Sequence, residues 1–329
     1  MTDSLKQLAV AVASNSADKT RAAAKLISRI ADRPETVPQL LAYLHDAPQP
    51  RLTLGITGAP GVGKSTLTDA IITEFRRRYP DRLLGIIAVD PSSPTTGGAI
   101  LGDRIRMMRH ASDPNVFIRS LASRGRLGGL TGGIMGTIRV LGALRSDIVI
   151  VETVGVGQTE VDVQNIADLV AVVLAPGFGD DIQLLKAGLL EIGDLFIINK
   201  ADRPGAQELQ AALESTMTLN AEINGTKRDD KPTVFLTTAT DGVGLVDVVD
   251  ALERQAEVRR NQWHQRRSER SMDAIRRALI DSAQRRFMGA LETNGTITEH
   301  LHRVLRGERS IDAVVQELLN HVASSLPKT

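Results

Sequence analysis

The fold of this 329-residue chain is decided by the stretch Gly58-Ala59-Pro60-Gly61-Val62-Gly63-Lys64-Ser65. It matches the pattern G-x-x-x-x-G-K-[ST] without a gap. The apolar, β-branched run Leu52–Thr57 precedes it, and the helix-like stretch Thr66–Ile72 follows. A chance glycine-rich turn would lack this flanking strand and helix, so we interpret the stretch as a phosphate-binding loop. The sequence therefore predicts a P-loop nucleotide-binding domain.

Each part of this loop has a predicted role in holding a nucleotide. The glycines let the backbone wrap closely, so that successive N–H groups point at the phosphates. Lys64 is expected to reach the β- and γ-phosphates, and the Ser65 hydroxyl is expected to ligate Mg²⁺. The residues predicted to hold the phosphates are Gly58, Ala59, Pro60, Gly61, Val62, Gly63, Lys64, Ser65 and Thr66.

A second motif, Asn199-Lys200-Ala201-Asp202, ends another apolar run and predicts that the base is guanine. The carboxylate of Asp202 can accept hydrogen bonds from both N1–H and the exocyclic amine of guanine, a donor pair that adenine lacks. Asn199 can contact the purine N7 and the neighbouring loop, and the stem of Lys200 can lie along the ring face. Thr238-Ala239, after the next apolar run, fits a small-residue loop that completes the guanine pocket.

Carboxylates that follow two other predicted strands indicate a Mg²⁺ site. Asp90 ends the strand Leu84–Val89, and Glu152 ends the strand Asp147–Val151. Oxygen ligands at strand ends beside a phosphate loop are well placed to hold Mg²⁺ or its waters. The loop between them is rich in Gly, Ser and Thr and contains Asp103, which could alternatively cap a helix.

The segment after Glu152 is the candidate switch of the site. Glu152-Thr-Val-Gly155 occupies the place where most GTPases have Asp-x-x-Gly, and the N–H of Gly155 is expected to touch the γ-phosphate. Val156 follows, instead of the Gln that orients the attacking water in Ras-like proteins, so intrinsic hydrolysis should be slow. Gln158 could replace that Gln or simply hydrogen-bond within the loop. The predicted catalytic residues are Lys64, Glu152 and Gly155.

The surrounding sequence predicts an α/β fold with a mostly parallel central sheet flanked by helices, because short β-branched runs are separated by segments of helix length. The predicted strands are Leu52–Thr57, Leu83–Val89, Asp147–Val151, Leu169–Leu174, Leu195–Ile198 and Thr233–Leu236. We expect three parts, namely a helical N-terminal extension over 1–48, a P-loop GTPase domain over 49–258 and a helical C-terminal dimerisation arm over 259–329.

The two flanking parts have helical patterns of different character. Residues 1–46 have apolar residues at helical spacing, which predicts two or three short helices ended by Ala47-Pro48-Gln49-Pro50. The segment from Arg259 is rich in Arg, and Ser310 is a plausible N-cap for a helix over Ile311–Leu319.

Composition limits the possible functions. Aromatic residues make up only 3% of the chain. Cysteine is absent, and this absence excludes disulfides, iron–sulfur clusters and thiol nucleophiles. The net charge of +1 provides no general attraction to nucleic acid or to a membrane. No apolar run approaches the roughly 18 residues of a membrane span, and the N-terminus lacks a secretory pattern. We therefore expect a soluble, cytoplasmic protein.

Taken together, these motifs resemble the MeaB/ArgK/MMAA family of GTPases, which are chaperones of adenosylcobalamin-dependent acyl-CoA mutases. Glu152 in place of Asp, followed by Thr-Val-Gly-Val-Gly-Gln, is highly specific to this group. The matching stretches are GAPGVGKST (58–66), AVDPSSPTTGGAILGDRIRM (88–107), VETVGVGQTE (151–160), PGFGDDIQLLKAG (176–188) and NKAD (199–202).

The resemblance implies a GTP-dependent chaperone that gates delivery of adenosylcobalamin to a mutase and helps to eject damaged cofactor. It implies a homodimer and a stretch at 176–188 that senses the mutase. The implied Mg²⁺ ligands are Ser65, Asp90, Asp103 and Glu152. The implied switch residues are Asp180, Asp181, Gln183 and Lys186. An acid/base role for Asp180-Asp181 is the alternative to solvated switch carboxylates.

Two departures from the family pattern bear on which mutase is the client: methylmalonyl-, isobutyryl- or 2-hydroxyisobutyryl-CoA mutase. The stretch Arg119-Ser-Leu-Ala-Ser-Arg-Gly-Arg126 differs from the Ser-Pro-rich version of methylmalonyl-CoA mutase chaperones. It looks more like the GTPase domain fused into isobutyryl-CoA mutases. Leu185 and Ala187 replace the Ile and Lys of relatives. Both departures favour an isobutyryl- or 2-hydroxyisobutyryl-type client.

Other functions are weighed against this interpretation. RNA binding by the Arg-rich segment 259–286 is disfavoured, because acidic residues interrupt it and Trp263 is its one stacking aromatic. His300-x-His302 does not place two ligands on one helix face. A nickel or zinc metallochaperone would need Cys/His ligands, and cysteine is absent. A kinase normally uses ATP, whereas Asp202 selects guanine.

Overall fold

A computed structural model gives the fold, and it divides the chain into two compact units, 1–261 and 262–329. The described residues are 2–14, 17–90, 108–122, 127–153, 163–177, 189–224, 232–258, 304, 306 and 308–317.

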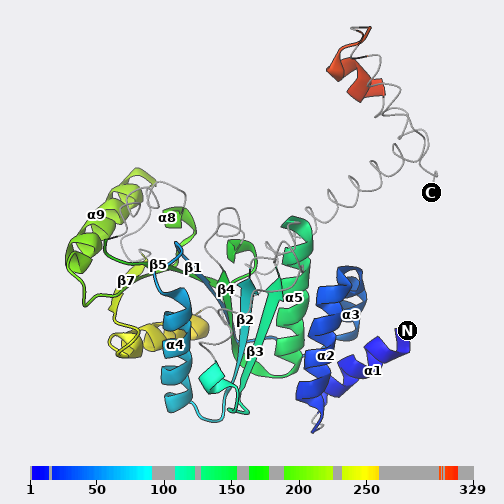
Figure 1. Cartoon of the computed structure of the whole chain (residues 1–329), viewed down its shortest axis with the longest axis horizontal. Coiled ribbons are helices and arrows are strands. Elements are labelled where there is room, and N and C mark those ends of the chain that lie inside the picture. The colour runs from blue at the N-terminus through cyan, green and yellow to red at the C-terminus, as the bar shows by residue number, and fades with distance from the viewer. Residues whose placement is uncertain are drawn as a thin grey trace. The chain divides into compact units, whose positions relative to one another are not determined.

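The described strands form one seven-stranded sheet in the order β3-β2-β4-β1-β5-β6-β7 (Figure 1). Every neighbouring pair is parallel, which confirms the predicted α/β class with a parallel sheet. The strands are β1 (Leu52–Thr57), β2 (Leu83–Asp90), β3 (Val116–Ala122), β4 (Ser146–Thr153), β5 (Leu169–Leu174), β6 (Leu195–Asn199) and β7 (Thr233–Thr237).

Strand β3 is the one strand of this sheet that the sequence analysis does not predict. It lies at the edge of the sheet, where a strand needs fewer apolar residues than a central strand does. Arg119 and Ser120 interrupt its apolar run and hide the pattern.

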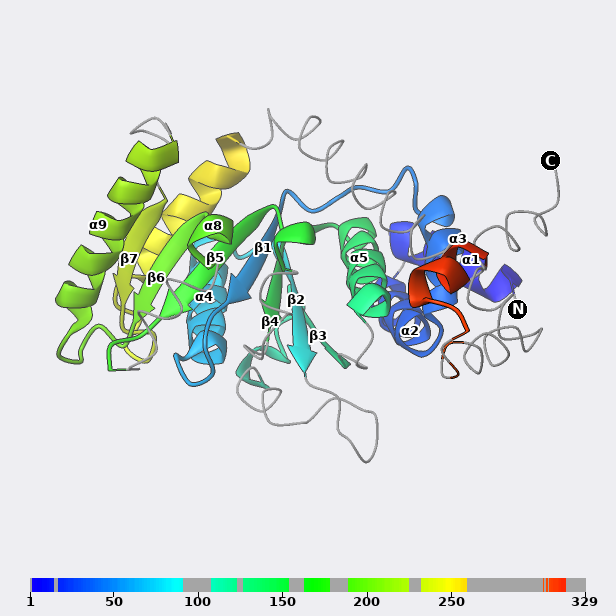
Figure 2. The ribbon, with the colours of Figure 1, turned by 90° about the horizontal axis from the view of Figure 1, so that it is seen from above.

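Helices cover both faces of the sheet (Figure 2). The helix α4 and the helix over 245–258 share one hydrophobic core, α5 joins a second core and α9 a third. The helices are α1 (Thr2–Ala13), α2 (Lys19–Asp32), α3 (Val37–Tyr43), α4 (Lys64–Arg78), α5 (Leu127–Ala143), α8 (Leu189–Ile192) and α9 (Ala206–Asn224). The short 3₁₀ turns are η1 (Pro34–Thr36), η2 (Met108–His110) and η3 (Val163–Asn165).

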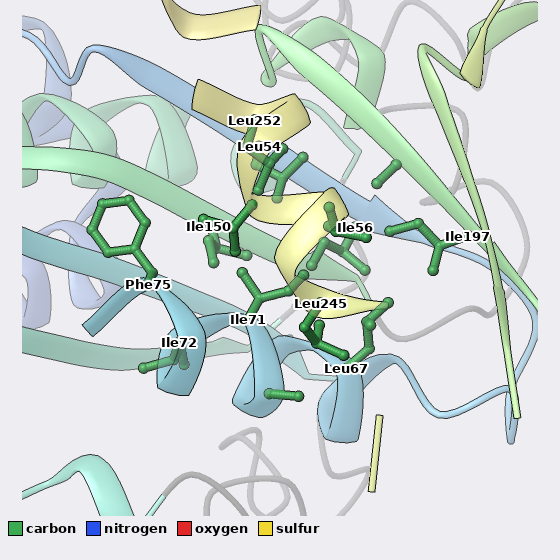
Figure 3. Close-up of a cluster of buried hydrophobic side chains, with 14 of the residues drawn as sticks. Leu54, Ile56, Leu67, Ile71, Ile72, Phe75, Ile150, Ile197, Leu245 and Leu252 are labelled. Atoms are coloured by element: carbon green, nitrogen blue, oxygen red, sulfur yellow. The ribbon is translucent and has the colours of Figure 1, made fainter. Parts of the chain in front are cut away.

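The core beneath α4 fixes the helix that follows the phosphate loop. Leu67, Ile71 and Phe75 of α4 are fully buried and lie against β1, β4 and the helix over 245–258 (Figure 3). They recur at intervals of four residues, so they occupy one stripe of the helix. Burial of such side chains contributes about 2 kcal/mol each, which holds the start of α4 in place.

The N-terminal helices α1, α2 and α3 pack beside α5 and share its core with β2, β3 and β4 (Figure 2). A Cβ on Gly136 of α5 would lie 3.3 Å from side-chain carbons of Ile30 and Val37, so the glycine permits this close packing. Arg139 of α5 donates to backbone carbonyls of residues 44, 45, 47 and 48. The predicted domain boundaries at 48 and 258 remain predictions.

The second unit is described over a few residues. A helix over 311–317 follows Ser310, whose Oγ accepts a hydrogen bond from the backbone N–H of Ala313 at 3.2 Å. This contact confirms Ser310 as the predicted N-cap. Most of the expected dimerisation arm, including His300 and His302, lies outside the described residues. Among the residues that the structure describes, none of the helices is both long and apolar enough to cross a bilayer.

Candidate nucleotide site

Parallel strands bring the predicted motifs to one edge of the sheet, because their carboxyl ends all point the same way. The phosphate loop leaves β1, Asn199 ends β6 and Thr238 follows β7. Within the sheet, Glu152 of β4 lies level with Ile56 of β1 and with Ala88 of β2. Residues from four separate parts of the sequence therefore meet around the loop.

Two glycines give the phosphate loop its shape. Gly58 has a φ of 141°, and a Cβ there would lie 2.2 Å from the carbonyl oxygen of Val173. Gly63 has a φ of 97°, and a Cβ there would lie 2.5 Å from Nδ2 of Asn199. Both positions combine a left-handed backbone with a close neighbour, so only glycine fits. The loop can then approach a phosphate closely, as the sequence pattern predicts.

Lys64 begins α4 and folds back over the loop. Its Nζ donates to the carbonyl oxygen of Gly58 at 2.7 Å and to that of Ala59 at 3.0 Å. Its side chain is buried, so the ammonium needs such acceptors in place of water. A phosphate oxygen carries negative charge, so the ammonium attracts it more strongly than it attracts a neutral carbonyl oxygen. The geometry thus suits exchange of a carbonyl for a phosphate.

Ser65 and Glu152 form the described part of the predicted metal site. Ser65 Oγ donates to Glu152 Oε1 at 2.5 Å, and both residues are buried. This bond turns the lone pairs of Oγ away from Glu152. A hydroxyl and a carboxylate are hard oxygen donors, which fit Mg²⁺.

The other two predicted ligands complete this set only in part. Asp90 ends β2, the strand beside β4, but its side chain is not among those described. Asp103 lies outside the described residues. Within the described ranges, no group of three or more His, Cys, Asp or Glu side chains converges on a point. The four-residue Mg²⁺ set therefore remains a prediction.

Asn199 connects the base-reading motif with the phosphate loop. Its Nδ2 donates to the carbonyl oxygen of Val62 at 3.0 Å. Its Oδ1 accepts from the backbone N–H of Ala239 at 3.1 Å and from Thr237 Oγ1 at 3.3 Å. The residue is 3% exposed, so these bonds form in an environment shielded from water. One of the two N–H bonds of its amide remains available to a purine.

Lys200 and Asp202 differ in what they contact. Lys200 has a left-handed backbone, with a φ of 59°, and its Nζ donates to the carbonyl oxygen of Gly61 at 2.6 Å. Asp202 is exposed and forms no hydrogen bond or ion pair within the described part of the chain. Its carboxylate is therefore available to the base. Thr238 and Val243 pair through both backbone groups, which closes the small loop that contains Ala239.

Sequence reasoning missed two sets of contacts around the site. The first comprises the bonds of Thr237 to Asn199 and of Lys200 to Gly61, which no local pattern announces. The second ties η2 to α4: Arg109 forms an ion pair with Asp69 and donates to Thr73, and His110 Nε2 lies 2.9 Å from Asp69 Oδ1. These contacts hold η2 against α4.

Several predicted residues lie outside the described part of the chain. They are Asp103, Gly155, Val156, Gln158, Asp180, Asp181, Gln183, Leu185, Lys186 and Ala187. Their expected roles in metal binding, catalysis and switching remain predictions.

Comparisons with known proteins agree with this geometry. A family model described as methylmalonyl-CoA mutase-associated GTPase MeaB matches residues 19–292. A Pyrococcus abyssi protein named as a GTPase is 45% identical over 237 residues, 72% of each chain. The fused isobutyryl-CoA mutase of Cupriavidus metallidurans is 38% identical over 233 residues, 69% of this chain and 21% of that protein.

A solved structure supports the fold assignment. The crystal structure of LAO/AO transport system kinase aligns with a TM-score of 0.68 and 22% identity, over 98% of this chain and 97% of that chain. At this identity the likeness concerns the fold alone. The family match covers most of the chain and includes the phosphate loop and the Asn-Lys-x-Asp motif. The chain belongs to the methylmalonyl-CoA mutase-associated GTPase family, MeaB, and is a P-loop GTPase.

Proposed function

We propose that this GTPase binds Mg²⁺-GTP at the carboxyl edge of its sheet and uses the nucleotide state to control an adenosylcobalamin-dependent acyl-CoA mutase. The observation that carries the nucleotide part is the direct link between base and phosphate elements. The side chain of Asn199 bonds Val62 of the phosphate loop, and that of Lys200 bonds Gly61. Two hydrogen bonds would therefore connect the motif that binds guanine through Asp202 with the loop that binds the phosphates.

The chain's own residues suggest how GTP is held. Lys64 would exchange the carbonyl oxygens of Gly58 and Ala59 for oxygens of the β- and γ-phosphates. Ser65 and Glu152, with Asp90 and Asp103, would hold Mg²⁺, which neutralises phosphate charge when bound. Asp202 would accept the two guanine donors. Phosphoryl transfer requires mainly positioning and charge neutralisation, and this arrangement supplies both.

Hydrolysis by the isolated protein should be slow. Val156 stands where Ras-like proteins have the Gln that orients water, and Gln158 is the nearest substitute in sequence. A partner that completes the site would accelerate turnover. Gly155 would respond to the γ-phosphate, and the segment with Asp180, Asp181, Gln183 and Lys186 would relay this state to the partner.

The choice of partner rests on the relatives. The family is described as mutase-associated, and the Cupriavidus metallidurans relative carries a similar stretch within a fused isobutyryl-CoA mutase. In our proposal the GTPase gates loading of adenosylcobalamin and release of damaged cofactor. The client is an isobutyryl- or 2-hydroxyisobutyryl-type mutase, and 259–329 supply the homodimer contact.

The test is phosphate release from GTP and from ATP, each with and without a cobalamin-dependent acyl-CoA mutase from the same genome. The expected result is slow GTP turnover that rises several-fold with the mutase, and no use of ATP. Turnover that ignores every candidate mutase would remove the chaperone role but keep the GTPase. Equal use of ATP would contradict the role of Asp202.

A further inference from the structure

The N-terminal helices form a groove that lies apart from the nucleotide motifs. It has a volume of about 850 Å³ and is lined by residues of α1, α2, η1, α3 and β3. Its charged lining residues are mostly cations. The cations are Arg21, Lys25, Arg29, Arg33 and Arg119, and the one carboxylate among the described lining residues is Asp32. The whole chain has a net charge of only +1, so this groove concentrates positive charge locally.

Three of these cations form a row along α2. Arg21, Lys25 and Arg29 are spaced four residues apart, which places successive side chains about 6 Å apart on one face of the helix. Like charges at this spacing destabilise an isolated helix, so the row has a cost for folding. Within the described part of the chain, the side chains of Arg21 and Lys25 form no hydrogen bond or ion pair. Arg29 donates to Ser4 Oγ at 2.8 Å.

The groove also has an apolar side and a contribution from the sheet. Leu5 and Leu8 of α1 and Ala24 of α2 line it next to the cations. Arg119 reaches it from the edge strand β3, with its guanidinium 5.9 Å from the ring centroid of Phe117. The edge strand therefore contributes to the same surface as the cation row.

We propose that this groove binds an acidic amphipathic helix on the surface of the client mutase. Asp or Glu side chains at four-residue spacing would match the 6 Å repeat of the cation row. The apolar face of such a helix would lie on the half-buried Leu8 of α1 and Ala24 of α2. This inference rests on the proposed mutase partnership and adds a docking site that is separate from the nucleotide motifs.

The shape and composition of the groove favour a helix over other anions. The row from Arg21 to Arg29 extends about 12 Å along α2, which is long for a single compact phosphate group. Among the described residues that line the groove, none is aromatic, so they offer a single-stranded nucleic acid no stacking platform. An acidic helix uses both the charged row and the apolar side.

The test compares two double charge reversals that change net charge equally. R21E/K25E alters the groove, whereas K6E/R254E alters two exposed cations outside it. Affinity for the mutase is measured by biolayer interferometry at low and moderate salt, with the same non-hydrolysable GTP analogue bound. We expect the groove variant to lose affinity about tenfold or more and the control to stay within about twofold. GTP turnover without mutase should be unchanged in both variants.

Each other outcome has a distinct meaning. Equal mutase affinity of the two variants would overturn the groove and leave the mutase partnership intact. Failure of the unaltered protein to bind any candidate mutase would overturn both the docking groove and the proposed mutase partnership. Binding of a single-stranded RNA that only the groove variant loses would overturn the acidic helix in favour of nucleic acid.

A second measurement does not depend on charge reversal. A photo-crosslinking phenylalanine derivative at Lys25 should label the mutase in the complex, and mass spectrometry identifies the labelled peptide. An acidic helical peptide is the expected product. A label on an apolar or basic stretch would contradict the inference, as would the absence of any crosslink in a complex that forms normally.

Discussion

The two edges of the sheet differ in how their charged side chains are held. At the amino edge, where the strands begin, arginines pair with carboxylates. At the carboxyl edge, Lys64 and Lys200 donate to backbone carbonyls of the phosphate loop. A phosphate oxygen can replace such a neutral carbonyl and, because it is negatively charged, attracts an ammonium more strongly. The difference indicates that one edge maintains the fold and the other is arranged to accept an anion.

The amino edge is a network that joins three strands to the helix over 245–258. Arg51 lies 3.1 Å from Asp147 and 2.7 Å from Glu253, and Arg82 lies 3.4 Å and 3.1 Å from the same two carboxylates. Burial alone would lower the pKa of Arg51, but its bonds and attraction to Asp147 and Glu253 raise it above its usual value. Arg82 also lies over the ring of Tyr79.

The largest effect is expected at the carboxyl edge. Lys64→Ala removes the ammonium that would neutralise phosphate charge in the transition state, so GTP turnover should fall at least about 100-fold. The mutation removes no ion pair of the amino edge, and the thermal midpoint should change little. Phosphate release at saturating GTP and a thermal melt measure both quantities. A turnover rate within threefold of that of the unaltered protein would contradict the role of Lys64 in neutralising phosphate charge.

Asp202→Asn tests the base-reading half of the same edge. The amide offers one donor and one acceptor, where the carboxylate offers two acceptors. Two charge-assisted hydrogen bonds to guanine are altered, so affinity for GTP should fall about 100-fold. Affinity for XTP should rise, because xanthine presents a donor next to an acceptor. Competition binding with labelled GDP measures both, and an unchanged preference for GTP would place the base elsewhere.

Glu253→Gln tests the amino edge. It removes a largely buried charge that faces two arginines, so the free energy of unfolding should fall by about 2 kcal/mol. Glu257→Gln is the matched control, since Glu257 is 69% exposed and lies 3.7 Å from Arg51. Chemical denaturation should leave the control unchanged, and GTP affinity should be unchanged in both. A loss of GTP affinity in E253Q alone would mean that the two edges are coupled.

The smallest effect concerns pH. Burial would raise the pKa of Asp113, but hydrogen bonds from Arg76 and from the backbone N–H of Asn115 lower it below its usual value. The folded state therefore binds this proton more weakly than the unfolded state does. The resulting stability is present above about pH 4 and is lost as pH falls through the folded pKa.

Asp113→Asn should accordingly flatten the loss of stability between about pH 5 and pH 3, by about 1 kcal/mol or less. Urea denaturation across that range compares the two proteins. Curves that stay parallel would show that Asp113 does not contribute to acid sensitivity.

The predicted strands and helices agree best with the structure where the pattern of neighbouring residues alone decides the element. Strands β1 and β5 coincide with their predicted runs, since both are buried along their whole length and rich in aliphatic residues. Strand β3 was missed, because an edge strand tolerates the polar pair Arg119 and Ser120. Two or three N-terminal helices were predicted, and α1, α2 and α3 are found.

The candidate site divides in the same way. The contact of Asn199 with a neighbouring loop was predicted from its motif, but its partner Val62 lies 137 residues away in sequence. The residues around Asn199 in the sequence do not predict that the carbonyl oxygen of Val62 is its partner. The catalytic and switch predictions beyond Glu152 concern residues outside the described part of the chain, and they stay predictions.

The phosphate loop, the guanine motif and the parallel α/β class are all predicted from the amino-acid sequence alone. Each follows from short-range constraints, such as glycine where φ must be positive and β-branched runs at regular intervals. The folded chain alone shows which distant groups come together: Asn199 bonds Val62, Arg51 pairs with Glu253, and Arg119 lines the same groove as the cation row of α2. Such meetings depend on chain crossovers and side-chain packing, which local patterns do not encode.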